Sequence, residues 1–403
     1  MAILVTDGDQ RSTLAVVRSL GRHGLDVIVG EQDNTSLAGV SRYCSEPWRY
    51  PSPLENPDGF QQALIDHVHH RSYELLIPMT DVTCALVSEI QTELERQVRI
   101  ALPAPGVFER SSHKGELMRL AQSLGIPVPP TEFITDLDQI RAIAPGLTYP
   151  VVVKSARSRV RQGNGWITGK VRYASNAEEL IRVYEALHRE MAYPLIQRRI
   201  EGDGSGLFAL FADSDMKAVF AHRRLREKPP SGGVSVLRES VAADERMIDY
   251  SRKLLRALNW NGVAMVEFKI DRVDNTPMLM EVNGRFWGSL QLAIDVGVDF
   301  PYLLYRVKCA LPVPEVTTYR TGVVSRWFLG DLDHLLAIWF RRRKNLSLPQ
   351  GHPGRLGSLW NFARACGWST RSEVWNCNDV RPAIRELRRY FGDLFRGLRR
   401  RLT

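Results

Sequence analysis

The first hundred residues alternate between short apolar runs and segments with helical spacing, and this alternation restricts the fold more than any other feature. The apolar runs lie at 2–6, 25–29 and 74–78, and helical spacing is found at 12–23 and 60–70. Strands that alternate with helices form a parallel sheet, and such sheets bind ligands beyond the carboxyl ends of their strands. The sequence therefore predicts an α/β domain with a parallel sheet.

Two of these strand ends are polar. One reads Asp7-Gly8-Asp9-Gln10-Arg11, and the other reads Pro78-Met79-Thr80-Asp81. Neither contains the GxGxxG fingerprint, so a Rossmann-type dinucleotide site is disfavoured. Solvated turns explain both ends equally well; if the domain has a site, we expect it to serve a small polar substrate.

The pattern changes after residue 128, which indicates a second region. Residues 103–110 are predicted to form a linker, and an amphipathic helix is expected to begin near Ser111 and Ser112. Further along, strand-like runs are joined by turn signals at 213–215 and 274–276. These signals favour an antiparallel α+β region.

Two strand-like runs carry the side chains most suited to chemistry. They read Val266-Glu267-Phe268-Lys269-Ile270-Asp271 and Leu279-Met280-Glu281-Val282-Asn283-Gly284-Arg285. Because strand residues alternate between faces, Glu281, Asn283 and Arg285 share one side, and a hairpin would bring Glu267 opposite them. Carboxylate and amide oxygens suit Mg²⁺, and a guanidinium suits phosphate or carboxylate. The alternative is a row of half-buried polar residues on a solvated sheet face.

Two lysines favour a polyphosphate site. Lys154 ends the apolar run 150–153, and Lys114 opens an amphipathic helix, where the helix dipole disfavours a cation. A bound polyphosphate would resolve that conflict, although a solvated surface position is the default for either lysine alone. The segment 155–165 contains glycines and arginines, which predicts either a mobile lid over phosphates or an ordinary flexible hairpin.

The order of these motifs resembles the ATP-grasp superfamily, in particular its carboxylate–amine ligase and carbamoyl-phosphate-synthase-like branch. Two phrases are typical of that branch: Leu124-Gly125-Ile126-Pro127-Val128-Pro129-Pro130-Thr131 and Tyr149-Pro150-Val151-Val152-Val153-Lys154. The resemblance spans residues 1–312. It implies an N-terminal parallel-sheet pre-ATP-grasp domain, then a two-lobed ATP-grasp fold and a basic, mainly helical C-terminal extension. The expected boundaries are 1–105 for the first domain, 111–192 for the small lobe, 193–312 for the large lobe with the metal site, and 313–403 for the extension.

The resemblance also implies a role for individual residues. Lys114 and Lys154 would bind ATP phosphates under the 157–169 loop, and Lys154 and Arg285 are the expected catalytic side chains. Glu267 and Glu281 would hold Mg²⁺, or Mn²⁺, with help from Asn283. The hinge would be formed by Gln197, Arg198, Arg199 and Ile200, with the backbone of Arg198 and Ile200 reading adenine. Gly204 stands where many members have an acidic ribose ligand, so either Asp203 substitutes for it or the ribose contact is missing.

Such enzymes phosphorylate a carboxylate with ATP and let an amine attack the acyl phosphate. The basic strand that contains His222, Arg224 and Arg226 is a candidate grip for an anionic substrate, or else a solvated strand edge. The expected partners are therefore a small-molecule carboxylate and an amine. Two alternatives stay open: a bicarbonate-activating enzyme like carbamoyl-phosphate synthase or biotin carboxylase, and a catalytically inactive nucleotide-binding scaffold.

The net charge of +9 comes from the C-terminal quarter, because residues 312–403 hold 17 basic and 7 acidic side chains. A basic tail alone is weak evidence for nucleic-acid binding, and we expect none. Five scattered cysteines and an N-terminus unlike a secretory signal favour the cytoplasm.

The last helix has an apolar stripe and a basic remainder. The stripe is formed by Ile384, Leu387, Phe391, Leu394, Phe395, Leu398 and Leu402. We favour packing of this stripe on the rest of the protein. A peripheral membrane contact or a protein contact through 381–403 is the alternative, and self-association is left open.

Overall fold

The computed structural model describes residues 1–163, 165–230, 233–341, 346, 348, 352–367 and 370–402, with backbone only for 395 and 397–402. Its first sheet has the order β3-β2-β1-β4-β5, and every neighbouring pair is parallel. The strands are β1 (Ala2–Val5), β2 (Val27–Glu31), β3 (Glu46–Arg49), β4 (Tyr73–Ile77) and β5 (Arg99–Ile100). The parallel sheet predicted for this region is confirmed.

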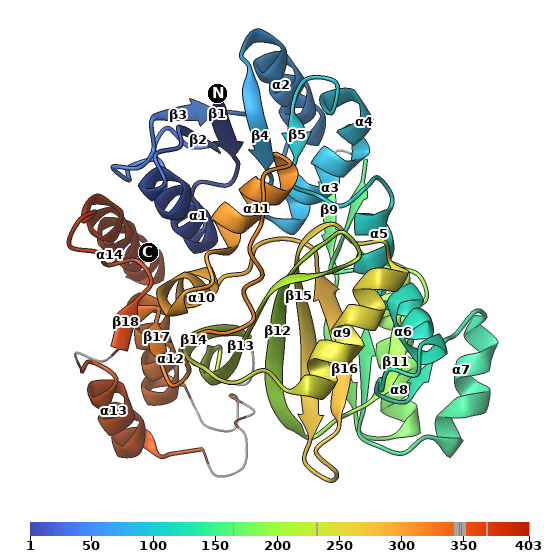
Figure 1. The fold of residues 1–403 in the computed structure, drawn as a ribbon. Coiled ribbons are helices and arrows are strands. Elements are labelled where there is room, and N and C mark those ends of the chain that lie inside the picture. Colours follow the sequence, from blue (N-terminus) through green and yellow to red (C-terminus); the bar gives the residue numbers. More distant parts are fainter. Residues whose placement is uncertain are drawn as a thin grey trace.

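Helices cover both faces of this sheet, as Figure 1 shows. They are α1 (Arg11–Arg22), α2 (Pro57–His70), α3 (Asp81–Glu89) and the short α4 (Gln91–Leu94). Ile3 and Val5 of β1 share a buried cluster with α1, whereas Leu4 belongs to a cluster with α2 and α3. Successive strand residues point to opposite faces, so a strand that is covered on both sides is apolar at every position.

The predicted linker at 103–110 is only partly a linker. Helix α5 (Val107–Ser112) begins inside it, after Gly106 with a φ of 80°, and Phe108 is buried in the core of the first sheet. The amphipathic helix begins two residues later than expected, as α6 (Lys114–Ser123). His113 caps it, because its Nδ1 accepts a hydrogen bond from the Glu116 N–H at 3.2 Å.

A four-stranded sheet with the order β10-β7-β11-β6 forms the next layer. Its strands are β6 (Thr131–Glu132), β7 (Val151–Lys154), β10 (Val171–Ala174) and β11 (Leu195–Arg198). The helices beside it are α7 (Leu137–Ile143), the 3₁₀ helix η1 (Ala144–Gly146) and α8 (Ala177–Glu190). A separate hairpin, β8 (Arg159–Gln162) and β9 (Gly165–Thr168), leaves this sheet after β7.

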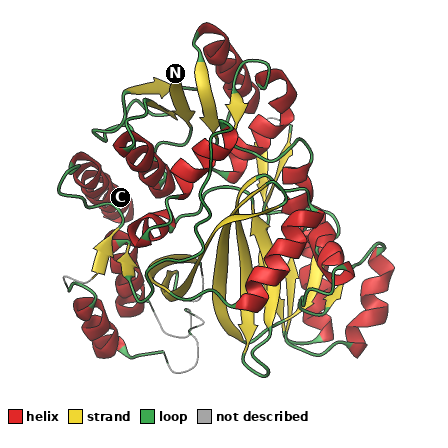
Figure 2. Ribbon diagram, in the orientation of Figure 1, coloured by secondary structure: helices red, strands yellow, loops and turns green. Residues whose placement is uncertain are grey.

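The largest sheet lies in the middle of the molecule, where Figure 2 shows its long strands surrounded by helices. Its order is β16-β15-β12-β13-β14-β17-β18, antiparallel except for the last pair. The strands are β12 (Gly202–Ala212), β13 (Asp215–Lys228), β14 (Val234–Ser240), β15 (Gly262–Asp271), β16 (Pro277–Asn283), β17 (Val324–Arg326) and β18 (Thr370–Ser372). The antiparallel region predicted from the turn signals is confirmed.

Both faces of the large sheet are buried. Leu207 of β12 packs with α9 (Glu245–Ala257) and α6, whereas Phe208 joins the cluster of α10 (Leu290–Val296), α11 (Phe300–Lys308) and α1. The cluster that contains Phe208 also contains Ile3 and Val5 of β1, so the first domain and the large sheet share one continuous core. This shared core fixes the strand ends of the first domain against the large sheet.

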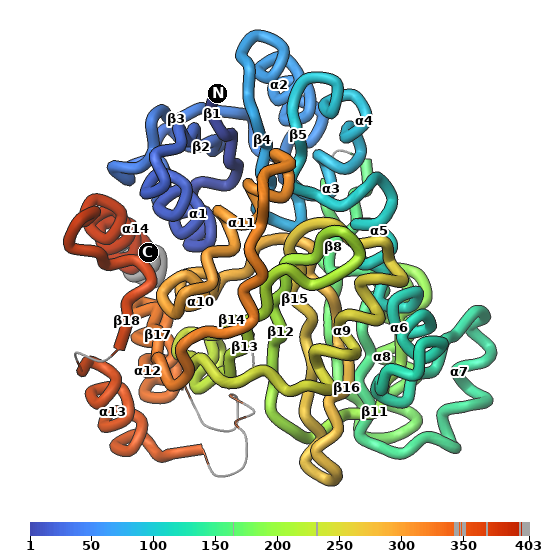
Figure 3. The backbone as a smooth tube through the Cα atoms, in the orientation of Figure 1, coloured from blue at the N-terminus to red at the C-terminus, as the bar shows by residue number. Residues whose placement is uncertain are grey.

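The C-terminal residues add helices α12 (Phe328–Phe340), α13 (Arg355–Arg364) and α14 (Arg381–Leu402). Strands β17 and β18 from the same region extend the edge of the large sheet beyond β14. In Figure 3 the C-terminal segment returns to the side of the first domain. No helix within the described ranges is both long and apolar enough to cross a membrane.

The packing expected for the apolar stripe of the last helix is wrong for the side chains that the structure describes. The exposed fractions are 42% for Ile384, 37% for Leu387, 48% for Phe391 and 46% for Leu394. The polar side of α14 makes the contacts instead: Arg389 pairs with Asp9, and Glu386 accepts a hydrogen bond from Trp327 Nε1 at 2.8 Å. The side chains of Phe395, Leu398 and Leu402 lie outside the described residues.

Candidate active site

The hairpin of β15 and β16 brings the two predicted carboxylates together. Glu267 and Glu281 are direct cross-strand partners, and Asn283 Nδ2 donates a hydrogen bond to Glu281 Oε1 at 3.1 Å. Burial raises the pKa of Glu267, and the nearby charge of Glu281 adds to this effect. Burial acts the same way on Glu281, but Lys114, Asn283 and Lys154 outweigh it and lower the pKa of that carboxyl.

Both predicted lysines lie near this carboxylate pair. Lys114 Nζ lies 3.3 Å from Glu281 Oε2 and donates a hydrogen bond to Ser158 Oγ at 2.9 Å. Lys154 ends β7, where burial and the charge of Lys114 lower its pKa to about 8. The charges of Glu281 and Glu267 raise this pKa, but they do not outweigh the burial. Side chains from α6, β7, β15 and β16 therefore meet at one place, where cations face a carboxylate pair.

Arg285 lies just beyond the end of β16 and is held by the first domain. Its Nε and Nη2 donate to the two carboxylate oxygens of Asp81, at 2.7 and 2.9 Å. Burial raises the pKa of Asp81, but the charges of Arg285, Lys114 and Arg159 outweigh it and lower that pKa. Asp81 follows β4, so one of the two polar strand ends seen in the sequence reaches the candidate site.

A small cavity of about 70 Å³ lies between these elements. It is lined by side chains of the first domain, the β8–β9 hairpin and the end of β16, including Asp81, Lys114, Arg157, Arg159, Glu281 and Asn283. Gly284 borders it where the chain passes close to Trp260: a Cβ at this position would lie 2.5 Å from that ring. A larger residue would displace the strand end that carries the site.

The 157–169 loop is a hairpin that contacts the first domain. Arg161 pairs with Glu89 at 2.7 Å and also with Asp58, and Trp166 Nε1 donates to the Pro53 carbonyl at 3.0 Å. Arg157, Ser158 and Arg159 at its base line the cavity, while Asn164 at its tip lies outside the described residues. The hairpin thus spans from the cavity to the first domain, as a cover over bound phosphates would.

The hinge residues lie in the small sheet. Gln197 is buried, and its Nε2 donates to Thr131 Oγ1 at 2.9 Å, while the Arg198 N–H donates to the Pro130 carbonyl at 2.9 Å. Ile200 is buried at the end of this segment. Asp203 is not brought to the lysines: its side chain is 87% exposed and pairs with Arg272 at 3.3 Å.

The three candidate substrate residues of β13 separate into different environments. Arg224 Nη2 lies 2.9 Å from Glu267 Oε2, and its Nη1 donates to Glu227 Oε1 at 3.0 Å. His222 is buried, contacts Ser289 Oγ at 2.7 Å, and has a pKa well below its usual value because of burial and the charges of Arg238 and Arg224.

Arg226 turns toward the C-terminal region. Its Nη2 lies 2.9 Å from Asp331 Oδ2, a carboxylate with no exposed surface. Of the three candidates, Arg224 is therefore the one in contact with the carboxylate pair. Its position could not be found from charge pattern alone, because His222, Arg223 and Arg226 offer equivalent cationic or protonatable groups.

Known proteins share this fold. Residues 211–328 match the family model described as ATP-grasp in the biosynthetic pathway with Ter operon, and this range contains Glu267, Glu281, Asn283 and Arg285. A biotin carboxylase from Campylobacter jejuni, in a beta-gamma-ATP complex, superposes with a TM-score of 0.64 at 15% identity over 80% of this chain and 74% of that one. The chain therefore has an ATP-grasp fold, and the segment with the candidate site matches an ATP-grasp family model.

Other ATP-grasp structures resemble this chain to a similar degree. The biotin carboxylase domain of the Hydrogenobacter thermophilus 2-oxoglutarate carboxylase, in complex with MgADP, ADP and bicarbonate, gives a TM-score of 0.63 at 15% identity, covering 80% of this chain and 73% of that one. The L-amino acid ligase from Bacillus licheniformis gives 0.60 at 16% identity, with 76% and 74% covered. At these identities the likeness establishes the ATP-grasp fold, and the predicted two-lobed architecture is confirmed.

Proposed function

We propose that this ATP-grasp protein is an ATP- and Mg²⁺-dependent ligase that activates a small carboxylate as an acyl phosphate for attack by an amine. The observation that carries the proposal is the meeting of Lys114, Lys154, Glu267 and Glu281 from four elements. Cations beside a carboxylate pair suit a triphosphate with its divalent ion, because the cations would bind phosphate oxygens and the carboxylates would bind the ion.

The carboxylate pair fits a magnesium ion that arrives with its nucleotide. No group of three or more His, Cys, Asp or Glu side chains in the described part of the chain is placed to hold a metal ion alone. Mg²⁺ commonly takes one or two protein carboxylates and completes its shell with water and substrate phosphates. Glu267 and Glu281, with Asn283 beside them, would supply the protein ligands, and the ion would neutralise phosphate charge.

The chain's own residues would position the reactants. A carboxylate oxygen attacks the γ-phosphorus of ATP, the bond to the β,γ-bridging oxygen breaks, and ADP leaves; the amine nitrogen then attacks the acyl carbon, phosphate leaves, and the amine loses a proton. Lys114 and Lys154 would hold phosphate oxygens, and Arg285 would stabilise the transferring phosphoryl. Arg224, in contact with Glu267, would hold the carboxylate substrate near the reacting atoms.

The reaction class is tested by trapping the activated acid. With ATP, Mg²⁺ and a panel of amino and sugar acids, we expect the protein to release ADP only with its cognate acid. Hydroxylamine should then give the corresponding hydroxamate. ADP release that depends on bicarbonate alone would favour the carboxylase-like alternative, and ATP binding without turnover with any acid would favour a scaffold.

A further inference from the structure

Five of the seven acidic side chains between residues 312 and 403 make contacts with other segments of the protein. Asp331 pairs with Arg226 and Arg326, Glu373 with Arg11 and Arg238, and Asp379 with Arg18. Asp333 binds Lys228 and accepts a hydrogen bond from Tyr390, and Glu386 accepts one from Trp327. Most carboxylates of the C-terminal region are therefore paired or hydrogen-bonded within the protein.

The arginines of the same region remain largely on the outside. Among the described residues after Arg326, the exposed arginines are Arg341, Arg355, Arg364, Arg371, Arg381, Arg388, Arg389 and Arg396. Only two of them pair with acids among the described contacts, Arg389 with Asp9 and Arg396 with Asp393. The outward surface of this region is therefore strongly basic.

Large apolar side chains are exposed among these arginines. More than half of the exposed large apolar side chains of the described residues lie after residue 312. They are Phe328, Phe340, Leu356, Leu359, Trp360, Trp375, Val380, Ile384, Leu387, Phe391 and Leu394. We call this set, with the exposed arginines of the preceding paragraph, the C-terminal face. Apolar clusters of this kind on a folded protein mark contact surfaces.

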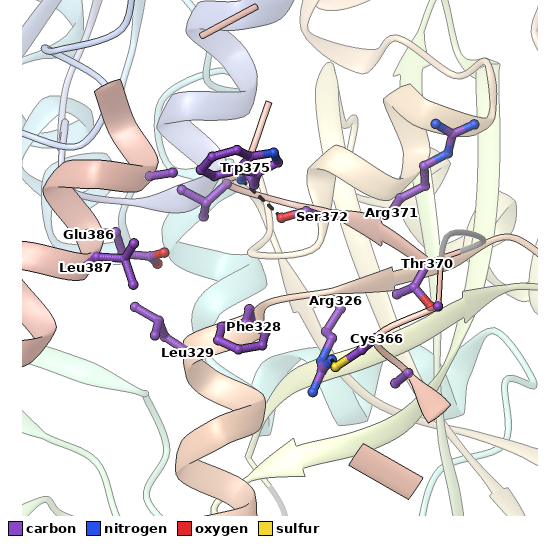
Figure 4. A pocket seen from close by; sticks show the side chains of 14 residues that line it. Arg326, Phe328, Leu329, Cys366, Thr370, Arg371, Ser372, Trp375, Glu386 and Leu387 are labelled. Carbon is purple, nitrogen blue, oxygen red and sulfur yellow. Dashed lines mark hydrogen bonds between the residues drawn. The ribbon is translucent and has the colours of Figure 1, made fainter. Parts of the chain in front are cut away.

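Three of these apolar side chains, Phe328, Trp375 and Leu387, line one groove. A cavity of about 380 Å³ lies between the start of α12, the end of α13, β18 and α14. Figure 4 shows Phe328, Trp375 and Leu387 around it, with Arg326 and Arg371 at its border. Leu387 belongs to both the groove and the outward stripe of α14, so the groove and the helix face are continuous.

From this arrangement we infer that the C-terminal face docks on an anionic membrane surface. A basic amphipathic helix whose apolar side points away from its own protein can bury that side at the headgroup–acyl boundary, while its arginines contact acidic lipids. Trp360 and Trp375 are of the type that sits at such boundaries. Because most acids of this region lie on the inside, few negative charges remain on the outer surface to be repelled by an anionic bilayer.

The test is sedimentation of the full chain with vesicles of phosphatidylcholine alone, or with about one third phosphatidylglycerol. We expect binding to the anionic vesicles only, weaker at 1 M salt because the Debye length falls to ~3 Å. The double variant Trp360→Glu/Phe391→Glu should reduce the bound fraction at least about tenfold, because it places two anions against an anionic surface. The control Val273→Glu alters a side chain that is 91% exposed on a distant turn, and should bind as the parent does.

Equal binding to neutral vesicles, no binding to either, or unchanged binding of the double variant would each overturn the inference. Far-UV circular dichroism and thermal unfolding establish that the variants fold. Light scattering of the free protein adds a separate outcome. A dimer that the double variant dissociates, without vesicle binding by the parent, would assign the C-terminal face to a second copy of the chain.

Discussion

Replacing Glu281 with glutamine is expected to lower turnover at least roughly 10²–10³-fold, the range seen when one group that organises transition-state charge is lost. Glu281 lies 3.3 Å from Lys114, accepts a hydrogen bond from Asn283 and faces Glu267, so it connects a predicted phosphate ligand with the predicted metal ligands. The amide would keep the shape of this side chain and lose its charge. ADP release with the cognate acid measures the effect.

The folded state should tolerate this substitution. The Glu281 side chain is 31% exposed, and the lost attraction to Lys114 is partly offset by the lost repulsion from Glu267, so we expect a change in unfolding free energy within about 1 kcal/mol. Glu178→Gln on α8, an exposed carboxylate away from the site, is the matched control and should retain full turnover. Normal activity of Glu281→Gln would refute the metal and phosphate assignment.

Replacing Glu373 with glutamine is expected to destabilise the protein by about 3–5 kcal/mol, because removing one partner leaves buried charge uncompensated. Glu373 follows β18 and is 1% exposed, where it pairs with both Arg11 and Arg238. Arg238 is equally buried, and burial together with the charges of Arg11 and Arg224 holds its pKa well below the usual value. Urea unfolding measures the loss.

The control for Glu373→Gln is a substitution in a solvent-exposed ion pair between a carboxylate and an arginine. Asp393 is 58% exposed and pairs with Arg396 on α14, so Asp393→Asn should change the unfolding free energy by less than about 1 kcal/mol. A loss below about 1 kcal/mol for Glu373→Gln would show that the C-terminal region contributes little to holding β14 and α1 together.

The hairpin that carries the two carboxylates could be predicted from the sequence because it depends on strand alternation and the turn at 274–276. The exact pairing could not be predicted, because the ladder that starts at this turn would place Glu267 opposite Met280, and a register shift between Glu267 and Phe268 brings it opposite Glu281 instead. Helix and strand positions singled out Lys114 and Lys154, but the resemblance to the ATP-grasp superfamily was needed to assign both to one nucleotide. The parallel first sheet followed from periodicity alone.

Contacts between distant segments could not be predicted in this way. Asp81 and Arg285 are 204 positions apart, and no local pattern connects them. Arg224 was one of several cations in its strand, and only the sheet register selects it. Helical periodicity identified the stripe of α14, yet it cannot say which side of a helix meets the protein, and here the polar side does.

The convergence of both lysines on one nucleotide is tested most directly by labelling with an amine-reactive ester at pH 8, read by peptide mass spectrometry. Near its pKa of about 8, Lys154 is partly neutral and therefore reactive. At ten times the Kd for ATP·Mg²⁺, labelling of Lys114 and of Lys154 should each slow roughly tenfold, as mass action requires. Lys308, with a pKa also near 8 but hydrogen-bonded to Leu102, and exposed Lys253 should be labelled at unchanged rates. Undiminished labelling of Lys154 with bound ATP·Mg²⁺ would contradict a shared triphosphate site.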